Sequence, residues 1–116
     1  MFNRLRRRFR RLIPSRRDLR LWRQRMTRGW DDSETWSLDY SLAKVIAPRL
    51  KRFKELNNGH PGDMTEKQWD DILDRMIAAF EFLGSDERWM CYDNKKWNEV
   101  NEGLKLFGEY FTALWW

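Results

Sequence analysis

The sequence predicts an all-α fold, with a three-helix bundle body preceded by one or two short basic helices. Apolar residues recur every three or four positions in several segments, which is the period of an amphipathic helix. No segment alternates apolar and polar residues over a convincing length, as a strand does, and turn-forming runs separate the periodic segments. Because 116 residues of 41% hydrophobic composition suffice for one small core, we expect one globular body.

Charge divides the chain into two parts. Residues 1–28 contain twelve Arg and one Asp, a net charge of +11, whereas residues 29–116 carry a net charge of −6. The sequence therefore predicts an Arg-rich basic amphipathic arm over residues 1–28 and an acidic helical bundle domain over residues 29–116. Because the two charges attract each other, docking of the arm on the body needs no further ligand.

The arm is expected to contain two helices. In residues 2–13 the apolar side chains are spaced three and four apart, with Arg on the remaining face, and a proline should end this helix. Ser15 and Asp18 then form a capping box, the pattern that begins a helix. A second short helix is predicted over residues 16–28, because Gly29 follows as a C-cap.

The first long body helix is expected after a turn-like segment in which Asp31, Asp32 or Ser33 can serve as the N-cap. Its apolar stripe consists of Trp36, Tyr40, Ala43, Ala47, Leu50 and Phe53. Pro48 lies inside this pattern and should bend or divide the helix near residues 44–48, because proline has no backbone N–H.

Two further body helices are predicted. Residues 57–63 form the clearest loop, and a capping box of Thr65 and Gln68 begins a helix that ends at Gly84. Its apolar stripe consists of Trp69, Ile72, Leu73, Met76, Ile77, Phe80 and Leu83. The last helix has the stripe Trp97, Val100, Leu104, Phe107, Phe111 and Leu114, and its two glycines permit close contact with a neighbouring helix. Residues 86–93 either begin that helix early or form a separate turn.

The tryptophans are expected to serve two purposes. Trp36, Trp69 and Trp97 lie on the predicted apolar stripes and should pack in the core or at its edge. Trp115 and Trp116 end the sequence, where side chains are usually exposed. They either fold back on the bundle or contact a partner, and we take them as candidate partner-binding residues.

The strongest functional signal is the density of Arg in the arm. Guanidinium groups donate paired hydrogen bonds to phosphate and displace counterions from nucleic acid, and the interleaved Phe9 and Trp22 can stack on unpaired bases. The candidate nucleic-acid-binding residues are Arg4, Arg6, Arg7, Arg8, Arg10, Arg11, Arg16, Arg17, Arg20, Arg23 and Arg25. The alternatives are docking on the acidic body, a membrane surface, a protein contact or a solvated tail.

We expect no enzymatic activity, cofactor or bound metal ion. Glu66 and Asp70 on one predicted helix, and Glu99 and Glu102 on the next, have a spacing that resembles helical Mg²⁺ sites of nucleotide hydrolases. A solvated bundle face has the same pattern, so a metal-dependent nucleotide hydrolase is a lesser alternative. His60 lies in a loop with no neighbouring nucleophile, and the single cysteine excludes an internal disulfide.

Residues 28–116 resemble a group of short uncharacterised proteins encoded by tailed phages and prophages. The similarity lies in the stretches RGWDDSETWSLDYSLAKVIAPRLKRFKE, GHPGDMTEKQWDDILDRMIAAFE and EGLKLFGEYFTALWW. The matching residues are Gly29 to Asp31, Trp36, Asp39, Ile46 to Leu50, Tyr110, Phe111, Leu114 and Trp115. This resemblance implies a phage context and no particular chemistry, and it does not extend to the Arg-rich arm.

Together these patterns predict a non-enzymatic phage accessory protein that binds nucleic acid, or a nucleoprotein partner, through the Arg-rich arm. The alternative is a protein-binding inhibitor or adaptor that acts on a host or phage protein. Surplus aromatic residues on short helices also allow a homo-oligomer. The mean hydropathy of −0.88 and the lack of a long apolar run or a signal-peptide pattern favour the cytoplasm of a bacterial host, or the virion.

Overall fold

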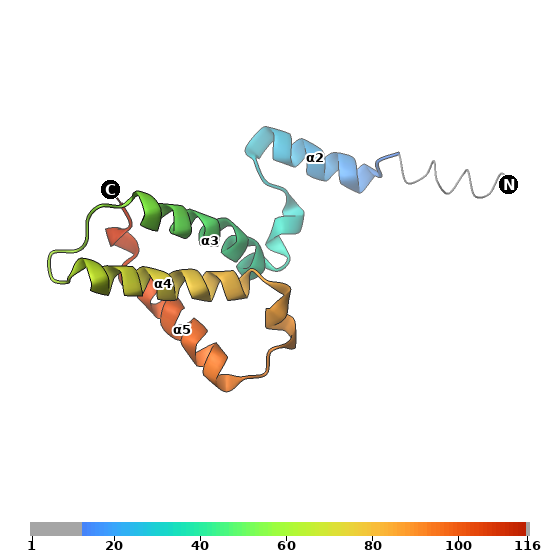
Figure 1. Ribbon diagram of the computed structural model, residues 1–116. Coiled ribbons are helices and arrows are strands. Elements are labelled where there is room, and N and C mark those ends of the chain that lie inside the picture. The colour runs from blue at the N-terminus through green and yellow to red at the C-terminus, as the bar shows by residue number, and fades with distance from the viewer. Residues whose placement is uncertain (1–12, 116) are drawn as a thin grey trace. The chain divides into compact units, whose positions relative to one another are not determined.

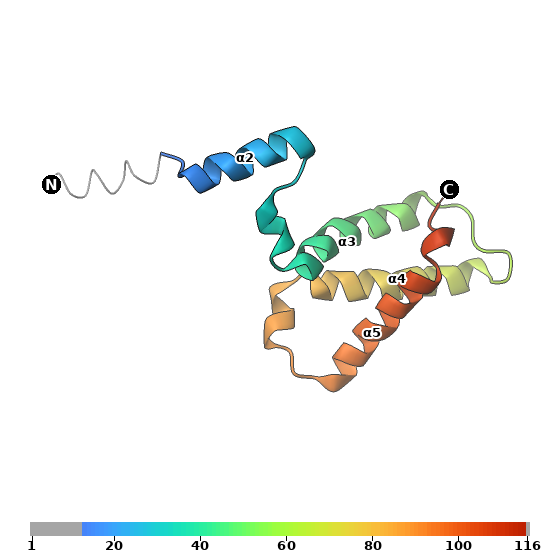
Figure 2. The same ribbon diagram turned by 180° about the vertical axis from the view of Figure 1, so that it is seen from behind.

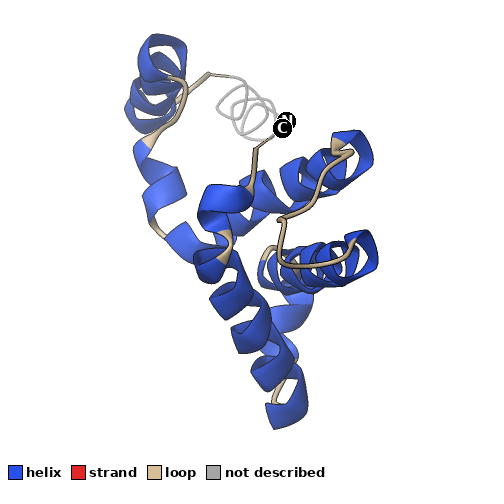
Figure 3. Cartoon of the chain, turned by 90° about the vertical axis from the view of Figure 1, so that its left-hand side faces the viewer, coloured by secondary structure: helices blue, strands red, loops and turns tan. Residues whose placement is uncertain are grey.

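The computed structural model describes residues 13–115, so residues 1–12 and 116 lie outside the description. All regular structure in the described residues is helical, as predicted (Figure 3). The α-helices are α2 (Arg16–Arg28), α3 (Leu38–Leu56), α4 (Glu66–Leu83) and α5 (Asn94–Glu109) (Figure 1). Short 3-10 helices are η1 (Asp32–Thr35), η2 (Asp86–Met90) and η3 (Phe111–Ala113). None of these helices is long and apolar enough to span a membrane.

The chain divides into two compact units, residues 1–37 and residues 38–116, which we call the N-terminal unit and the helical body. In the N-terminal unit, α2 packs on η1. In the helical body, α4 is the central helix, and α3 and α5 each pack on it (Figures 1 and 2). The predicted bundle-like body with a short basic helix before it is confirmed, whereas the helix predicted over residues 2–13 falls almost wholly outside the described residues.

Helix α4 supplies most of the core because its apolar residues face both neighbouring helices. Its buried residues are Trp69, Leu73, Met76, Ile77, Ala79, Phe80, Phe82 and Leu83. Aromatic side chains join it to α5, with ring centroids 4.8 Å apart for Phe80 and Phe107 and 5.2 Å apart for Phe82 and Trp97. The predicted capping box at Thr65 and the helix end at Gly84 are both confirmed.

Helix α3 begins at Leu38, later than the sequence predicts. Asp31 does act as an N-cap, but the helix that it caps is the short η1, and the chain turns before α3 starts. Trp36 is therefore not on α3, and the prediction that it packs in the core is wrong: it is 76% exposed. Pro48 does not divide α3, which is continuous through it, because only one backbone hydrogen bond is lost and Ala47 is buried beside it.

The last predicted helix is shorter than its apolar stripe. Residues 86–90 form the separate η2, which decides between the two alternatives for this segment. Helix α5 ends at Glu109, so Phe111 lies in η3 and is exposed. Gly103 is buried against α4, as expected for a glycine that permits close helix contact.

Candidate nucleic-acid interface

Local sequence signals determine both ends of α2. The Ser15 Oγ accepts the Asp18 N–H, and the Asp18 carboxylate accepts the Ser15 N–H, each at 3.1 Å. At the other end Gly29 adopts a left-handed conformation with φ 84°, and its N–H donates to the Arg25 carbonyl at 2.9 Å. The predicted helix over residues 16–28 is confirmed, and its capping residues are those that the sequence indicated.

Helix α2 presents two exposed stripes. Arg16, Arg20 and Arg23 are spaced i, i+4 and i+7, so they lie along one face, which we call the Arg stripe. Leu19, Trp22 and Met26 have the spacing i, i+3 and i+7 and form an adjacent exposed apolar stripe. No residue of α2 is buried, so both stripes are open to solvent in the described structure.

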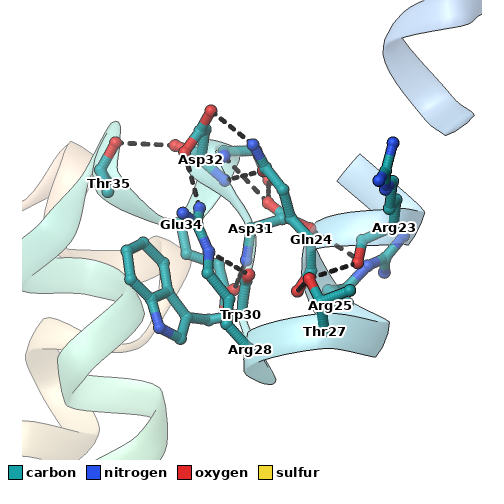
Figure 4. Close-up of polar contacts among 11 residues, drawn as sticks. Arg23, Gln24, Arg25, Thr27, Arg28, Trp30, Asp31, Asp32, Glu34 and Thr35 are labelled. Carbon is teal, nitrogen blue, oxygen red and sulfur yellow. Dashed lines mark hydrogen bonds and ion pairs between the residues drawn. The ribbon is translucent and has the colours of Figure 1, made fainter. Parts of the chain in front are cut away.

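The remaining side of α2 is held against η1 by polar contacts (Figure 4). The Gln24 amide both donates to the Asp32 carboxylate at 2.8 Å and accepts the Asp32 N–H at 2.9 Å. Arg28 donates to the same carboxylate at 2.7 Å, and Arg25 Nε lies 3.1 Å from the Asp31 carboxylate. Arg23 lies apart from these carboxylates in Figure 4. Arg25 and Arg28 therefore have acidic partners within the N-terminal unit.

Asp31 organises this contact and is only 4% exposed. Its carboxylate accepts the Ser33 hydroxyl and the Ser33 N–H, the latter at 2.9 Å, while its own N–H donates to Glu34 at 2.7 Å. The hydrogen bond from the Ser33 side chain, helped by the Ser33 N–H and the Arg25 charge, lowers the pKa of Asp31 below the usual 3.8. The buried carboxylate is thus kept ionised where it holds Arg25.

The N-terminal unit should consequently keep its Asp31 contacts until the pH falls below 3.8. A carboxyl whose pKa is lowered by folding stabilises the folded state above its unfolded pKa, and this stabilisation is lost as the pH falls through the folded pKa. The measurement is the NMR chemical shift of the Ser33 amide from about pH 6 to about pH 2. The transition should vanish in Asp31→Asn, and a wild-type midpoint above 3.8 would contradict the expectation.

Two exposed tryptophans of the N-terminal unit are covered by guanidinium groups. The Arg17 guanidinium lies 5.2 Å from the ring centroid of Trp36, and that of Arg28 lies 3.8 Å from Trp30. Such cation–π contacts leave the opposite ring face unused. Neither pair was predicted, because the apolar pattern places Trp36 on the following helix and gives Trp30 no role.

The described candidate residues divide into two groups. Arg16, Arg17, Arg20 and Arg23 are exposed and form no ion pair with a described residue. Arg25 is exposed but pairs with Asp31. Arg4, Arg6, Arg7, Arg8, Arg10 and Arg11, the remaining candidates of the arm, lie outside the described residues, as does the partner-binding candidate Trp116.

The carboxylates considered for a metal site do not converge. In residues 13–115, no three His, Cys, Asp or Glu side chains are placed to hold a metal ion together. Neighbouring acidic groups of α4 instead pair with cations, as Asp74 does with Lys54 Nζ at 2.6 Å. His60 is exposed, and its Nδ1 lies 2.9 Å from the Pro61 carbonyl oxygen. Glu66, Asp70, Glu99 and Glu102 thus fit the solvated bundle face better than the cation site.

Trp115 is 76% exposed and does not fold into the core. It borders a cavity of about 440 Å³ in the helical body, together with Leu56, His60 and Trp69. An exposed tryptophan at the rim of a cavity is typical of a contact surface.

Comparison with known protein families, curated proteins and solved structures finds no match to this chain. The resemblance to the phage group therefore stays a prediction. The geometry of the N-terminal unit is the basis for a functional argument.

Proposed function

We propose that this protein is a non-enzymatic accessory protein of a tailed phage that binds nucleic acid through its Arg-rich arm, residues 1–28. The observation that carries the proposal is the Arg stripe of α2. Its three guanidinium groups are exposed and lack acidic partners in the described residues, although the chain is rich in acidic residues. The phage context is supported by the sequence resemblance of residues 28–116.

Arg25 and Arg28 differ from the Arg stripe because they have acidic partners, and this difference supports the assignment. An arm that served only to neutralise acidic groups of its own chain would pair all its guanidinium groups as Arg25 and Arg28 are paired, with N–O distances of 3.1 and 2.7 Å. The Arg stripe borders this contact without joining it: hydrogen bonds and, to a smaller extent, the charge of Arg20 lower the pKa of Asp32, but no member of the stripe forms an ion pair with Asp31 or Asp32. Free guanidinium groups at helical spacing can each bind one phosphate and release its counterions.

Removing the Arg stripe should weaken nucleic-acid binding. The triple variant Arg16→Gln, Arg20→Gln, Arg23→Gln is expected to bind about tenfold or more weakly at about 0.1 M salt. The slope of log affinity against log salt should fall by about 2 to 3, because each lost phosphate contact releases about one counterion fewer. The measurement is fluorescence anisotropy of labelled DNA and RNA titrated with the full chain at several salt concentrations.

The matched control removes three positive charges from the helical body. Lys67→Gln, Lys95→Gln and Lys105→Gln change exposed residues of α4 and α5 and reduce the net charge equally. This control should keep the wild-type salt slope. An equal loss in both triple variants would show that net charge alone acts, and a wild-type chain that binds neither DNA nor RNA at low salt would refute the proposal.

A protein-binding role is the second candidate, favoured by the exposure of Trp115. An inhibitor or adaptor would place this indole and the neighbouring cavity against a host or phage protein, since exposed tryptophans dominate many interfaces. The full chain and Trp115→Ala can be compared by quantitative capture of proteins from infected cells. Identical capture by both would remove this candidate.

A further inference from the structure

We infer that the nucleic acid bound by the arm is single-stranded, with unpaired bases stacked on Trp22 and Trp36. This inference rests on the proposed function and specifies its ligand. The Arg stripe explains affinity for phosphate but does not explain why two exposed indoles lie beside it. Large exposed aromatic side chains next to guanidinium groups are the combination that single-strand binding requires.

Trp22 lies on the apolar stripe that borders the Arg stripe. Arg23 is four residues after Leu19 and three before Met26, so side chains of the two stripes are neighbours on the helix surface. Trp22 is 57% exposed and has no aromatic or cationic ring contact in the described residues. Its indole is therefore available to a base whose phosphate is held by the Arg stripe.

Trp36 lies near the opposite edge of the Arg stripe. Arg17, which covers one face of the Trp36 ring, is the i, i+3 neighbour of Arg20 on α2. The 76% exposure of Trp36 leaves the second ring face open to a base. A guanidinium on one face of the indole also keeps a phosphate donor close to the stacked nucleotide.

A single strand is favoured over a duplex because the faces of its bases are accessible for stacking. In a duplex the base faces are stacked on one another, so only base edges and phosphates are accessible. The phosphates of a duplex can bind the Arg stripe, but its bases cannot stack on the two indoles. Unpaired bases expose their faces, and stacking on an aromatic side chain tolerates any base sequence.

The test compares a labelled oligothymidylate of about 12 nucleotides with a duplex of the same length, both titrated with the full chain. Trp22→Leu and Trp36→Leu should each raise the Kd for the single strand about 5- to 100-fold, because each removes one stacking surface. The Kd for the duplex should change less than about threefold. Trp89→Leu is the matched control. Trp89 is 52% exposed and the Arg88 guanidinium lies 4.6 Å from its ring centroid, but it belongs to the helical body, so this variant should bind the single strand as wild type does.

The outcomes separate this inference from the proposed function. If both tryptophan variants bind the single strand as wild type does while the Arg-stripe variant loses affinity, the inference is wrong and nucleic-acid binding stands. A wild-type chain that prefers the duplex leads to the same conclusion. A chain that binds neither oligonucleotide but binds vesicles of phosphatidylserine and phosphatidylcholine overturns both, and assigns the Arg and apolar stripes to an anionic membrane surface. Circular dichroism of each variant is the check that its helices are retained.

Discussion

Replacing Trp69 by alanine is expected to lower the free energy of unfolding by about 3 to 5 kcal/mol. Trp69 is 1% exposed, and its ring packs edge-on against Tyr110 with centroids 5.8 Å apart. Its removal leaves a large cavity between α4 and the end of α5, which the rigid core cannot fill. Because small domains have only about 5 to 15 kcal/mol of stability, urea denaturation should show a much lower midpoint.

Two companion variants identify the cause of this loss. The Trp69 Nε1 is buried with no hydrogen-bond partner in the described residues, and an unpaired buried donor costs about 1 to 3 kcal/mol. Trp69→Phe removes that donor while keeping an aromatic ring, so it should lower the free energy of unfolding by less than about 1.5 kcal/mol. Trp115→Ala should change stability by less than about 0.5 kcal/mol because Trp115 is exposed. A loss for Trp115→Ala as large as that for Trp69→Ala would contradict this description of the core.

The parts of the fold that follow from local signals could be predicted from the sequence. The capping boxes at Ser15 and Thr65 involve residues three positions apart, and the helix end at Gly29 depends on a left-handed glycine directly after the last turn. Each signal therefore acts without help from distant segments. The apolar stripe that follows Thr65 also repeats often enough to predict a buried helix, and α4 is the centre of the body.

The start of α3 could not be predicted because several residues compete for the same role. Asp31, Asp32 and Ser33 are all good helix caps. In the structure Asp31 caps η1. A contact from α2 stabilises this arrangement, because the Gln24 amide donates a hydrogen bond to the Asp32 carboxylate. Local sequence patterns do not specify such a contact. This difference also explains the exposure of Trp36. It was predicted to pack in the core as part of the first long body helix, but α3 begins at Leu38, two residues after it.

The Arg residues of the candidate interface could be predicted from the sequence, but their ion pairs within the N-terminal unit could not. The Arg density of the arm indicates phosphate binding, and the spacing of Arg16, Arg20 and Arg23 places them on one face of a helix. Composition alone makes Arg25 an equal member of the site. Its ion pair with Asp31 depends on how the chain turns back after α2, which spacing along one helix does not specify.

Gly103→Ala is expected to lower the free energy of unfolding by about 2 to 3 kcal/mol, because α4 and α5 approach too closely for a side chain at this position. A Cβ at Gly103 would lie 2.5 Å from the Ala79 Cβ and 2.6 Å from the Arg75 carbonyl oxygen. The second of these is a backbone atom, so relief of the clash requires α4 to move. The usual helix-propensity gain of about 1 kcal/mol for alanine over glycine offsets only part of this cost.

Gly108 provides the matched control for this prediction within the same helix. A Cβ at Gly108 would meet nothing within 4 Å, so Gly108→Ala should raise the free energy of unfolding by about 0.5 to 1 kcal/mol. Adding Ala79→Gly to Gly103→Ala should recover only part of the loss, since the Arg75 carbonyl still blocks the new methyl group. Guanidinium denaturation of the wild type and these three variants tests the contact directly. Equal stability of Gly103→Ala and Gly108→Ala would mean that α4 and α5 do not meet at Gly103, because helix propensity alone would then decide both variants.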